Sequence, residues 1–477
     1  MNMDDPHELT GACAIGSRRE LFADDWLIDR LDGVRRCLHH PVPADVALSF
    51  DRPWEGPACC YVTVFQDADR YRMYYGCYPF GTKSPDQYTG YAESSDGIHW
   101  TRPVLNLVDF KGSRENNLLW EGPKAHNFSP FIDTHPDVAP DQRYKAVTGD
   151  PPLALASADG IHWRKLQETP ILQSDNPAFE RLGIAYWGKD PSSGRALFDS
   201  HNLAFWDSRI GEYVYYFRGW TAVPDLPGVR IRTFFRSRSQ DFLRWSEPEA
   251  VEFSTPPTLL DQFYTNCVQP YFRAPHIYVA LPMRLAWRKP LSQAADRDGL
   301  GEAVLMVSRD GLHFHRYMEA FLRPGLDQRD WSKHSNMMAW GMLSLSPGEI
   351  SLYHTRHHYA PTAHLQRTVL RADGFVSLQA PYSGGEFTTR PLVFSGNRLE
   401  INVSSGAAGS LRVEIQDESG RPIEGFGLHE SREFYGDEIE YIAQWRGGAD
   451  VGRLAGRPVR LRFVLQDADV FSLRFLE

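Results

Sequence analysis

The chain has 477 residues, 42% of them hydrophobic, and a formal net charge of −10. This length is too great for one ordinary domain, and the hydrophobic fraction is sufficient for a large core. Acidic and basic residues are interspersed without a basic stripe, so we expect no nucleic acid partner.

The N-terminal residues, the lengths of the apolar stretches and the cysteines indicate the cellular compartment. The first 17 residues include Asp4, Asp5 and Glu8 and lack the apolar core of a signal peptide. No stretch approaches the ~20 apolar residues of a membrane span. The six cysteines show no C-x-x-C spacing, which favours reduced thiols. We therefore expect a cytoplasmic protein with no membrane partner.

One sequence pattern recurs along the chain. The pattern Ser-x-Asp-x-x-x-aromatic begins at Ser94, Ser157, Ser239 and Ser308, and a weaker copy begins at Arg371. Asp-Gly at the centre of most copies is typical of a tight turn, and the aromatic residue packs as the next strand begins.

Each copy follows a strand rich in tyrosine or β-branched residues, and every unit accommodates about four antiparallel strands. Repeats of this length predict propeller blades. We expect an all-β chain with a five-bladed β-propeller over residues 18–383. The alternating strands after that point predict a β-sandwich over residues 384–477.

The first strand of each blade is expected at the centre of the propeller. Four of these strands are preceded by a polar residue and an asparagine: His126-Asn127, His201-Asn202, Thr265-Asn266 and Ser335-Asn336. Symmetry would place them at one rim of a central funnel. Histidine and asparagine there either bind sugar hydroxyls or satisfy backbone groups at the strand ends, and both interpretations remain open.

With these turns, polar strand entries and trailing strands, the chain resembles the glycoside hydrolases of families 32, 43 and 68. The propeller likeness covers about residues 18–380, and the sandwich is most similar to that of family 32. The Trp-Met-Asn-Asp-Pro and Glu-Cys signatures of family 32 are absent from this sequence. The resemblance implies a sugar-cleaving propeller and transfers no catalytic residue.

Cleavage of a glycosidic bond requires two carboxyl groups across that bond. The candidate acids lie where inner strands or long loops begin: Asp199, Glu55, Glu302, Asp261 and Asp25. Asp199 is the first choice for base or nucleophile, with Glu55 or Glu302 as the acid. Each of the five is alternatively a turn former or a solvated loop acid.

Other side chains are assigned to substrate binding. Arg218, with Arg232, could pair with a site carboxylate or with an acidic group of the substrate, and Trp54 could stack on a sugar face. His126, His201 and His334 could instead converge on a metal, but no local ligand spacing supports zinc. We expect no cofactor, and a structural cation on the propeller axis is left open.

Two functions follow from these assignments. The first is a glycoside hydrolase, exo-acting on an oligosaccharide or glycoside, with phosphorolysis as a variant. The second is a non-catalytic carbohydrate-binding or structural propeller. Both expect a carbohydrate partner, and the sequence assigns no oligomeric state. An opposed pair of acids within ~10 Å would favour the first.

Overall fold

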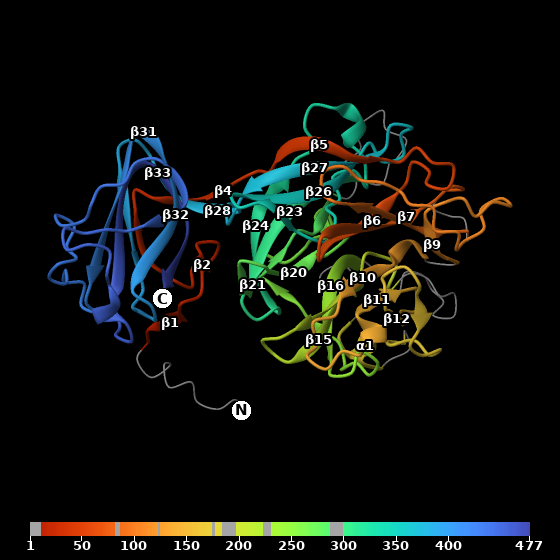
Figure 1. The fold of residues 1–477 in the computed structure, drawn as a ribbon. Helices are drawn as coiled ribbons and strands as arrows, with labels where there is room; N and C mark the ends of the chain where they lie inside the picture. The colour runs from red at the N-terminus through yellow and green to blue at the C-terminus, as the bar shows by residue number, and fades with distance from the viewer. Residues whose placement is uncertain are drawn as a thin grey trace. The chain divides into compact units, whose positions relative to one another are not determined.

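The computed structural model describes residues 11–81, 86–122, 125–173, 177–183, 197–222, 230–286 and 299–477. The chain divides into two compact units. Unit 1 comprises residues 1–40, 272–275 and 371–477, and unit 2 comprises residues 41–271 and 276–370. Strands dominate both (Figure 1). Across the described ranges, the one α-helix is α1 (Pro177–Arg181), and no helix is long and apolar enough to cross a membrane.

Unit 2 contains five sheets that follow one another along the chain. The first three are four-stranded, and each is built from consecutive strands. They comprise β6 (Cys60–Asp67), β7 (Arg70–Cys77), β8 (Tyr88–Ser94) and β9 (Leu118–Glu121); β10 (Ser129–Ile132), β11 (Tyr144–Thr148), β12 (Leu153–Ser157) and β13 (Arg164–Lys165); and β14 (Leu203–Asp207), β15 (Glu212–Ala222), β16 (Arg230–Ser239) and β17 (Glu249–Ala250).

The last two sheets are modified versions of the same plan. In the fourth, two short strands, β19 and β22, pair with each other at one end, and β18 is added beside β24. The fifth takes its outer strand from the start of the chain, because β5 pairs with β27. Their strands are β18 (Glu252–Phe253), β19 (Gln262–Phe263), β20 (Val268–Tyr271), β21 (Ala274–Ala280), β22 (Met283–Ala286), β23 (Leu300–Ser308) and β24 (His313–Leu322); and β25 (Leu343–Ser346), β26 (Glu349–Arg356), β27 (His364–Arg371) and β5 (Val42–Ser49).

The first strands of successive sheets are neighbours. β6 contacts β10, β10 contacts β14, β14 contacts β20, and β25 contacts β6. The Trp340 indole, just before β25, donates to the Val268 carbonyl of β20 at 3.0 Å. The fifth sheet thus contacts the first through β25 and β6, and the segment that precedes β25 is hydrogen-bonded to the fourth sheet.

The repeated turn has one geometry in its four strong copies. In the copy at Ser308, the Asp310 carboxylate accepts the backbone N–H groups of Leu312 and His313, each at 2.8 Å. The fourth position has positive φ, as in Gly311 (φ 75°), which suits glycine because it has no Cβ. In the third copy Phe242 takes this position at φ 67°, and its ring is fully buried against Phe131.

The remaining strands form unit 1. Its eight-stranded sheet runs β3-β29-β33-β28-β4, with β2 and β31 also paired to β33, and with β32 paired to β31. The parallel pair of β1 and β30 lies outside that sheet. The strands are β1 (Cys13–Gly16), β2 (Glu20–Leu21), β3 (Ile28–Asp32), β4 (Arg35–Leu38), β28 (Val376–Ala380), β29 (Gly385–Thr389), β30 (Leu392–Phe394), β31 (Arg398–Gln416), β32 (Asp437–Ile442) and β33 (Arg460–Leu476).

This division differs from the expected boundary between residues 383 and 384. Residues 18–40 were assigned to the propeller, but β2, β3 and β4 pair with β33, β29 and β28 of unit 1. The weak fifth turn belongs there too: Asp373 is buried and accepts hydrogen bonds from Arg19 and Arg273 at 3.2 and 2.9 Å. Pairing between the two ends of the chain leaves no local sequence signal, which explains the difference.

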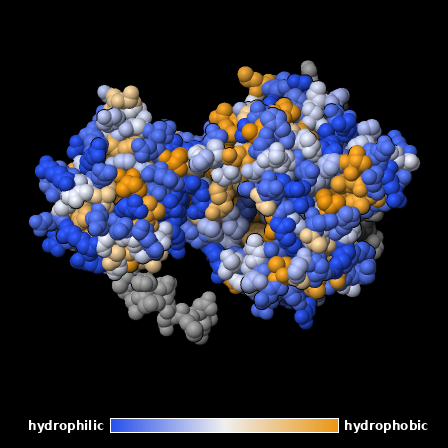
Figure 2. All heavy atoms as spheres, in the orientation of Figure 1, coloured by the Kyte–Doolittle hydropathy of each residue, from blue (hydrophilic) through white to orange (hydrophobic). Residues whose placement is uncertain are grey.

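Each unit has its own hydrophobic core. In unit 1 the core residues come from the long strands β31 and β33 and from the N-terminal segment, with Phe22 packed edge-on against Phe387. In unit 2 the largest core is rich in tyrosine and phenylalanine. On the face that Figure 2 shows, hydrophilic residues cover most of the surface, and hydrophobic residues lie among them.

Candidate functional site

Asp199 lies at the centre of a group of aromatic and basic side chains. One carboxylate oxygen is 3.3 Å from His126 Nε2, and the other is 3.7 Å from Arg218 Nη2. The Asp199 side chain is 32% exposed, whereas those of His126 and Arg218 are each 4% exposed. We call Asp199, His126, Arg218, Tyr61 and Tyr264 the Asp199 cluster. Solvent therefore reaches the carboxylate of this cluster, while its partners are held in the interior.

Local structure explains how these side chains meet. Asp199 lies four residues before β14, His126 lies in the 3₁₀ turn before β10, and Arg218 lies in β15. Tyr61 opens β6 with φ 52°, at an irregularity in its pairing with β7. Tyr264 comes directly after β19. The cluster thus draws on four of the five sheets.

The His126 ring connects Asp199 to an amide. His126 Nδ1 is 2.5 Å from the Gln87 carbonyl oxygen, so Nδ1 donates there. In a neutral ring Nε2 then carries no hydrogen, so a hydrogen bond to Asp199 needs a proton on the carboxyl group or a second proton on the ring. The contact places an imidazole ring next to a solvent-accessible carboxylate.

Aromatic rings surround this pair. Tyr61 stacks on both His126 and His201, with ring centroids 5.5 and 5.8 Å apart, and Tyr78 packs on His126 at 5.0 Å. The Tyr61 hydroxyl donates to that of Tyr264 at 3.3 Å. Such rings offer apolar faces and hydroxyl groups, the combination that suits a sugar.

Beyond Tyr264 the cluster continues to two more histidines. Tyr264 packs on His334 with ring centroids 4.7 Å apart, and His334 Nδ1 is 3.3 Å from His358 Nε2. Burial lowers the pKa of both rings, that of His358 to about 3, so they are neutral at pH 7. Within the described ranges, His334 Nε2 and His358 Nδ1 have no hydrogen-bond partner.

The first-sheet candidates have structural roles. Glu55 is fully buried, accepts a hydrogen bond from the Tyr75 hydroxyl at 2.7 Å and pairs with Arg102 at 2.8 Å. Burial raises the pKa of Glu55, although Arg102 opposes that shift. The Trp54 indole donates to Asn117 at 2.7 Å. Glu55 was expected as the catalytic acid or as a solvated loop acid, but it is fully buried and cannot reach a substrate in this structure.

The fourth-sheet candidates are paired with arginines. Both carboxylate oxygens of Asp261 accept from Arg316 Nη2, at 2.6 and 2.5 Å. Glu302 accepts from Arg284 Nε at 2.8 Å, and β22 and β23 hold these two residues directly opposite each other. Both carboxylates are therefore occupied by arginine side chains of their own sheet.

Asp25 belongs to unit 1, whereas the other four candidate acids belong to unit 2. Its side chain is 74% exposed and pairs with Arg36 at 2.7 Å. The sequence near Asp25 carried no signal that residues 20–38 pair with the C-terminal strands. Of the five candidate acids, Asp199 alone lies in the Asp199 cluster.

The four rim asparagines bind backbone groups rather than facing solvent. Asn202 donates to the Phe198 carbonyl at 2.6 Å and accepts from the Arg218 N–H at 2.9 Å. Asn127, Asn266 and Asn336 make equivalent bonds to carbonyls of neighbouring segments. All four are at most 2% exposed, so the structure favours the backbone-satisfying interpretation.

His201 is also enclosed. Its Nε2 is 3.0 Å from the Thr63 hydroxyl, and burial lowers its pKa to about 3. Sequence reasoning missed Tyr61, Tyr78 and His358 as members of this region. Tyr264 stood next to the Thr265-Asn266 signal, whereas nothing local distinguished Tyr61 from the other strand tyrosines.

The described residues contain one group with metal-ligand spacing: Asp327, Asp330 and His357. Asp330 already pairs with Arg356, and Asp327 pairs with Arg329 at 2.7 Å and with His357 at 3.0 Å. Arginines thus balance these carboxylates, and the donor set does not fit a cation.

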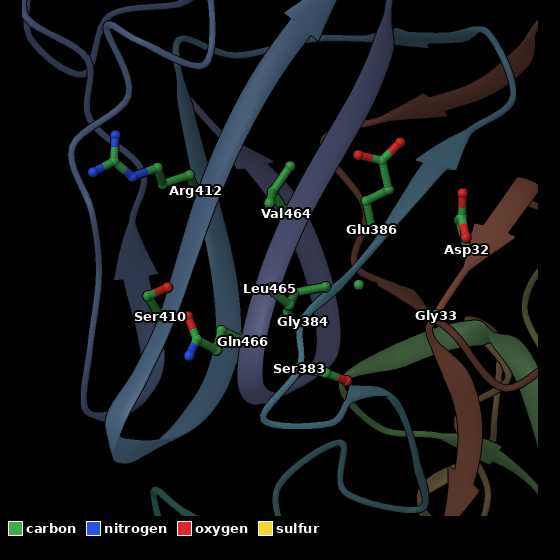
Figure 3. A pocket seen from close by; sticks show the side chains of 11 residues that line it. Asp32, Gly33, Ser383, Gly384, Glu386, Ser410, Arg412, Val464, Leu465 and Gln466 are labelled. Carbon is green, nitrogen blue, oxygen red and sulfur yellow. The ribbon is translucent and has the colours of Figure 1, made fainter.

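Unit 1 carries a hollow of about 460 Å³ beside Gly384 (Figure 3). Its charged lining residues include Glu386, which pairs with Arg462, and Arg412, which pairs with Glu433. No aromatic residue lines it. The hollow therefore lacks the features that make the Asp199 cluster a candidate site.

No family model and no curated protein matches the chain. Solved structures are similar at low identity. A glycoside hydrolase is 12% identical with a TM-score of 0.45, over 70% of this chain and 92% of that chain. An N-acetylgalactosamine deacetylase from F. plautii, in complex with blood group B trisaccharide, is 13% identical with a TM-score of 0.46, over 72% and 97%. A mannoside phosphorylase-family (GH130) structure is 15% identical with a TM-score of 0.42, over 70% and 94%. At these values they assign neither activity nor site residues.

Proposed function

We propose that unit 2 is a five-bladed propeller that cleaves glycosidic bonds at the Asp199 cluster, and that unit 1 is a β-sandwich. The contacts of β6 with β10 and β25, and of β14 with β10 and β20, together with the hydrogen bond from Trp340 to Val268, support the propeller. The observation that carries the function is the solvent-accessible Asp199 carboxylate held against His126 among aromatic rings.

Asp199 is assigned as base or nucleophile at the anomeric carbon. The His126 imidazole next to Asp199 provides local acid–base capacity, and Arg218 favours the ionised carboxylate of Asp199. Tyr61, Tyr78 and Tyr264 would contact the sugar. Glu55 and Glu302, the earlier choices for the acid, are held by Arg102 and Arg284 and are not assigned this role.

A non-catalytic carbohydrate-binding propeller is the second candidate. It is favoured by a specific observation: Glu55, Asp261 and Glu302 are all paired with arginines, so none of them opposes Asp199 as a free carboxyl group. Without a second acid, the Asp199 cluster would bind a sugar without cleaving it.

Asp199→Asn separates the two candidates. If the protein is a hydrolase, a panel of nitrophenyl glycosides should include a substrate, and this variant should lower its kcat/KM by roughly 10²- to 10⁴-fold. The melting temperature should hardly change, because the side chain is partly exposed. Asp141→Asn, at an exposed ion pair with Arg164, is the matched control and should retain wild-type turnover. Sugar binding without turnover in the wild type would support the binding module instead.

A further inference from the structure

Two arginines lie side by side at the Asp199 cluster. Arg218 and Arg232 belong to the paired strands β15 and β16. Their guanidinium carbons lie 6.0 and 4.3 Å from the Trp220 ring centroid, and 5.1 and 5.8 Å from that of Tyr264. Both residues are less than a tenth exposed. Two cations are therefore held against the same pair of aromatic rings.

The hydrogen-bonding capacity of Arg218 is not used up. Its Nε is buried and has no hydrogen-bond partner in the described ranges, and its Nη2 is 3.7 Å from Asp199, beyond hydrogen-bond distance. Burying a guanidinium donor without an acceptor is costly. The Nε donor of Arg218 is therefore available for a further acceptor oxygen.

The charges around Arg218 and Arg232 also favour a bound anion. Arg232 Nη1 donates to the uncharged Gln262 side chain at 2.8 Å. Burial and the neighbouring Arg218 lower the pKa of Arg232 to about 10, whereas Tyr264, Tyr61 and Asp199 oppose this shift. An anion bound between the two guanidinium groups would be attracted by both, and a planar guanidinium suits the two oxygens of a carboxylate or phosphate.

We propose that the substrate of this site carries an anionic group, a carboxylate or a phosphate, which Arg218 and Arg232 bind. This inference rests on the proposed function, because it names the substrate class of the same site. The sugar ring would lie against Tyr264 and Trp220, with its anionic group toward the arginines and the bond to be cleaved toward Asp199.

Isothermal titration calorimetry at low ionic strength tests the proposal by binding alone. The probes are glucuronate and galacturonate, their neutral counterparts glucose and galactose, and inorganic phosphate. We expect at least one anionic probe to bind more tightly than the neutral sugars. A preference for the uronates would assign the anion to a sugar carboxylate, whereas a preference for inorganic phosphate would assign it to a phosphate group.

Arginine variants locate the binding. Arg218→Gln should weaken anion binding by roughly ten- to a hundredfold, the range expected for hydrogen bonds to a charged group. Arg218→Lys keeps the charge but loses the planar fork, so its anion affinity should lie between those of wild type and Arg218→Gln. This conservative variant controls for loss of binding through misfolding. Arg238→Gln is the matched control, because Arg238 lies on β16, the strand that carries Arg232 and pairs with β15, and is already paired with Glu212. Equal affinities for charged and neutral probes, or equal effects of Arg218→Gln and Arg238→Gln, would overturn the proposal.

Asp199→Asn distinguishes failure of this inference from failure of the proposed function. Removing the carboxylate leaves both arginines in place, so anion binding should strengthen even though turnover is lost. Anion binding that depends on Arg218, in a protein that cleaves no glycoside, would keep the inference and refute the hydrolase. Cleavage of neutral glycosides without any anion binding would keep the hydrolase and refute the anionic substrate.

Discussion

At the scale of single residues, identity alone did not separate structural from functional side chains. Asn202 and Asp199 lie three positions apart in a polar segment before β14. The amide of Asn202 is enclosed by backbone groups, whereas the carboxylate of Asp199 reaches solvent. Asparagine suits both roles because it donates and accepts, and only the surrounding backbone decides between them.

Asn202→Ala should therefore destabilise unit 2. The change leaves the buried Phe198 carbonyl and Arg218 N–H without their partner, which costs about 1–3 kcal/mol of unfolding free energy. Urea denaturation measures the loss. Asn106→Gly is the control: Asn106 is exposed and has φ 59°, which glycine adopts freely, so its stability should change by less than about 0.5 kcal/mol. Equal stability of Asn202→Ala and wild type would contradict the assigned role.

At the scale of elements, the repeated turns do more than reverse the chain. The Gly160 carbonyl of the second sheet accepts a hydrogen bond from the Tyr74 hydroxyl of the first sheet at 3.0 Å, and Tyr216 donates to Gly311 at 2.7 Å in the same way. Tyr353 of the fifth sheet donates to Gly97 of the first. The strand tyrosines and the Asp-Gly turns, two separate sequence signals, are therefore parts of one contact between neighbouring sheets.

Asp310→Asn tests the internal bonding of such a turn. Burial tends to raise the pKa of Asp310, but hydrogen bonds from the backbone and ring of His313 outweigh it and lower this pKa to about 2. A lowered carboxyl pKa stabilises the fold above the unfolded value near 4, and this contribution is lost as the pH falls from about 4 to about 2. We expect the variant to lose roughly 0.5–1 kcal/mol at pH 7, a small cost because the side chain is about half exposed.

The difference between Asp310→Asn and wild type should shrink over that acidic window. Urea midpoints between pH 2 and pH 7 measure it. Asp69→Asn, whose side chain is 88% exposed, should show no comparable change with pH. A constant difference from pH 7 down to pH 2 would show that the Asp310 charge does not stabilise the turn.

At the scale of the whole molecule, the two ends of the chain complete each unit. In unit 2, β5 supplies the outer strand of the last sheet. In unit 1, β2, β3 and β4 pair with strands that lie more than 300 residues later in the sequence, and Arg19 binds the buried Asp373 and Glu400. Neither unit is therefore a continuous segment of the sequence.

Fragments test this arrangement. Residues 384–477, the domain expected from the sequence, should not unfold cooperatively, because β33 loses β2 and β28, and β29 loses β3. A fragment that joins residues 371–477 through a flexible linker to residues 11–40 should unfold cooperatively, as followed by circular dichroism in urea. Cooperative unfolding of residues 384–477 alone would show that the N-terminal strands are dispensable.

The sequence by itself determined the strand-rich secondary structure and the turns, because these depend on local periodicity and on Asp-Gly chemistry. The role of Asp199 stays a prediction. The sequence did not determine which acids are available, since Glu55, Asp261 and Glu302 are neutralised by arginines that are distant in the chain. Nor did it show that residues 18–40 belong to unit 1. Hydrogen bonds and ion pairs between distant segments depend on how the chain folds back on itself, and only the tertiary structure decided them.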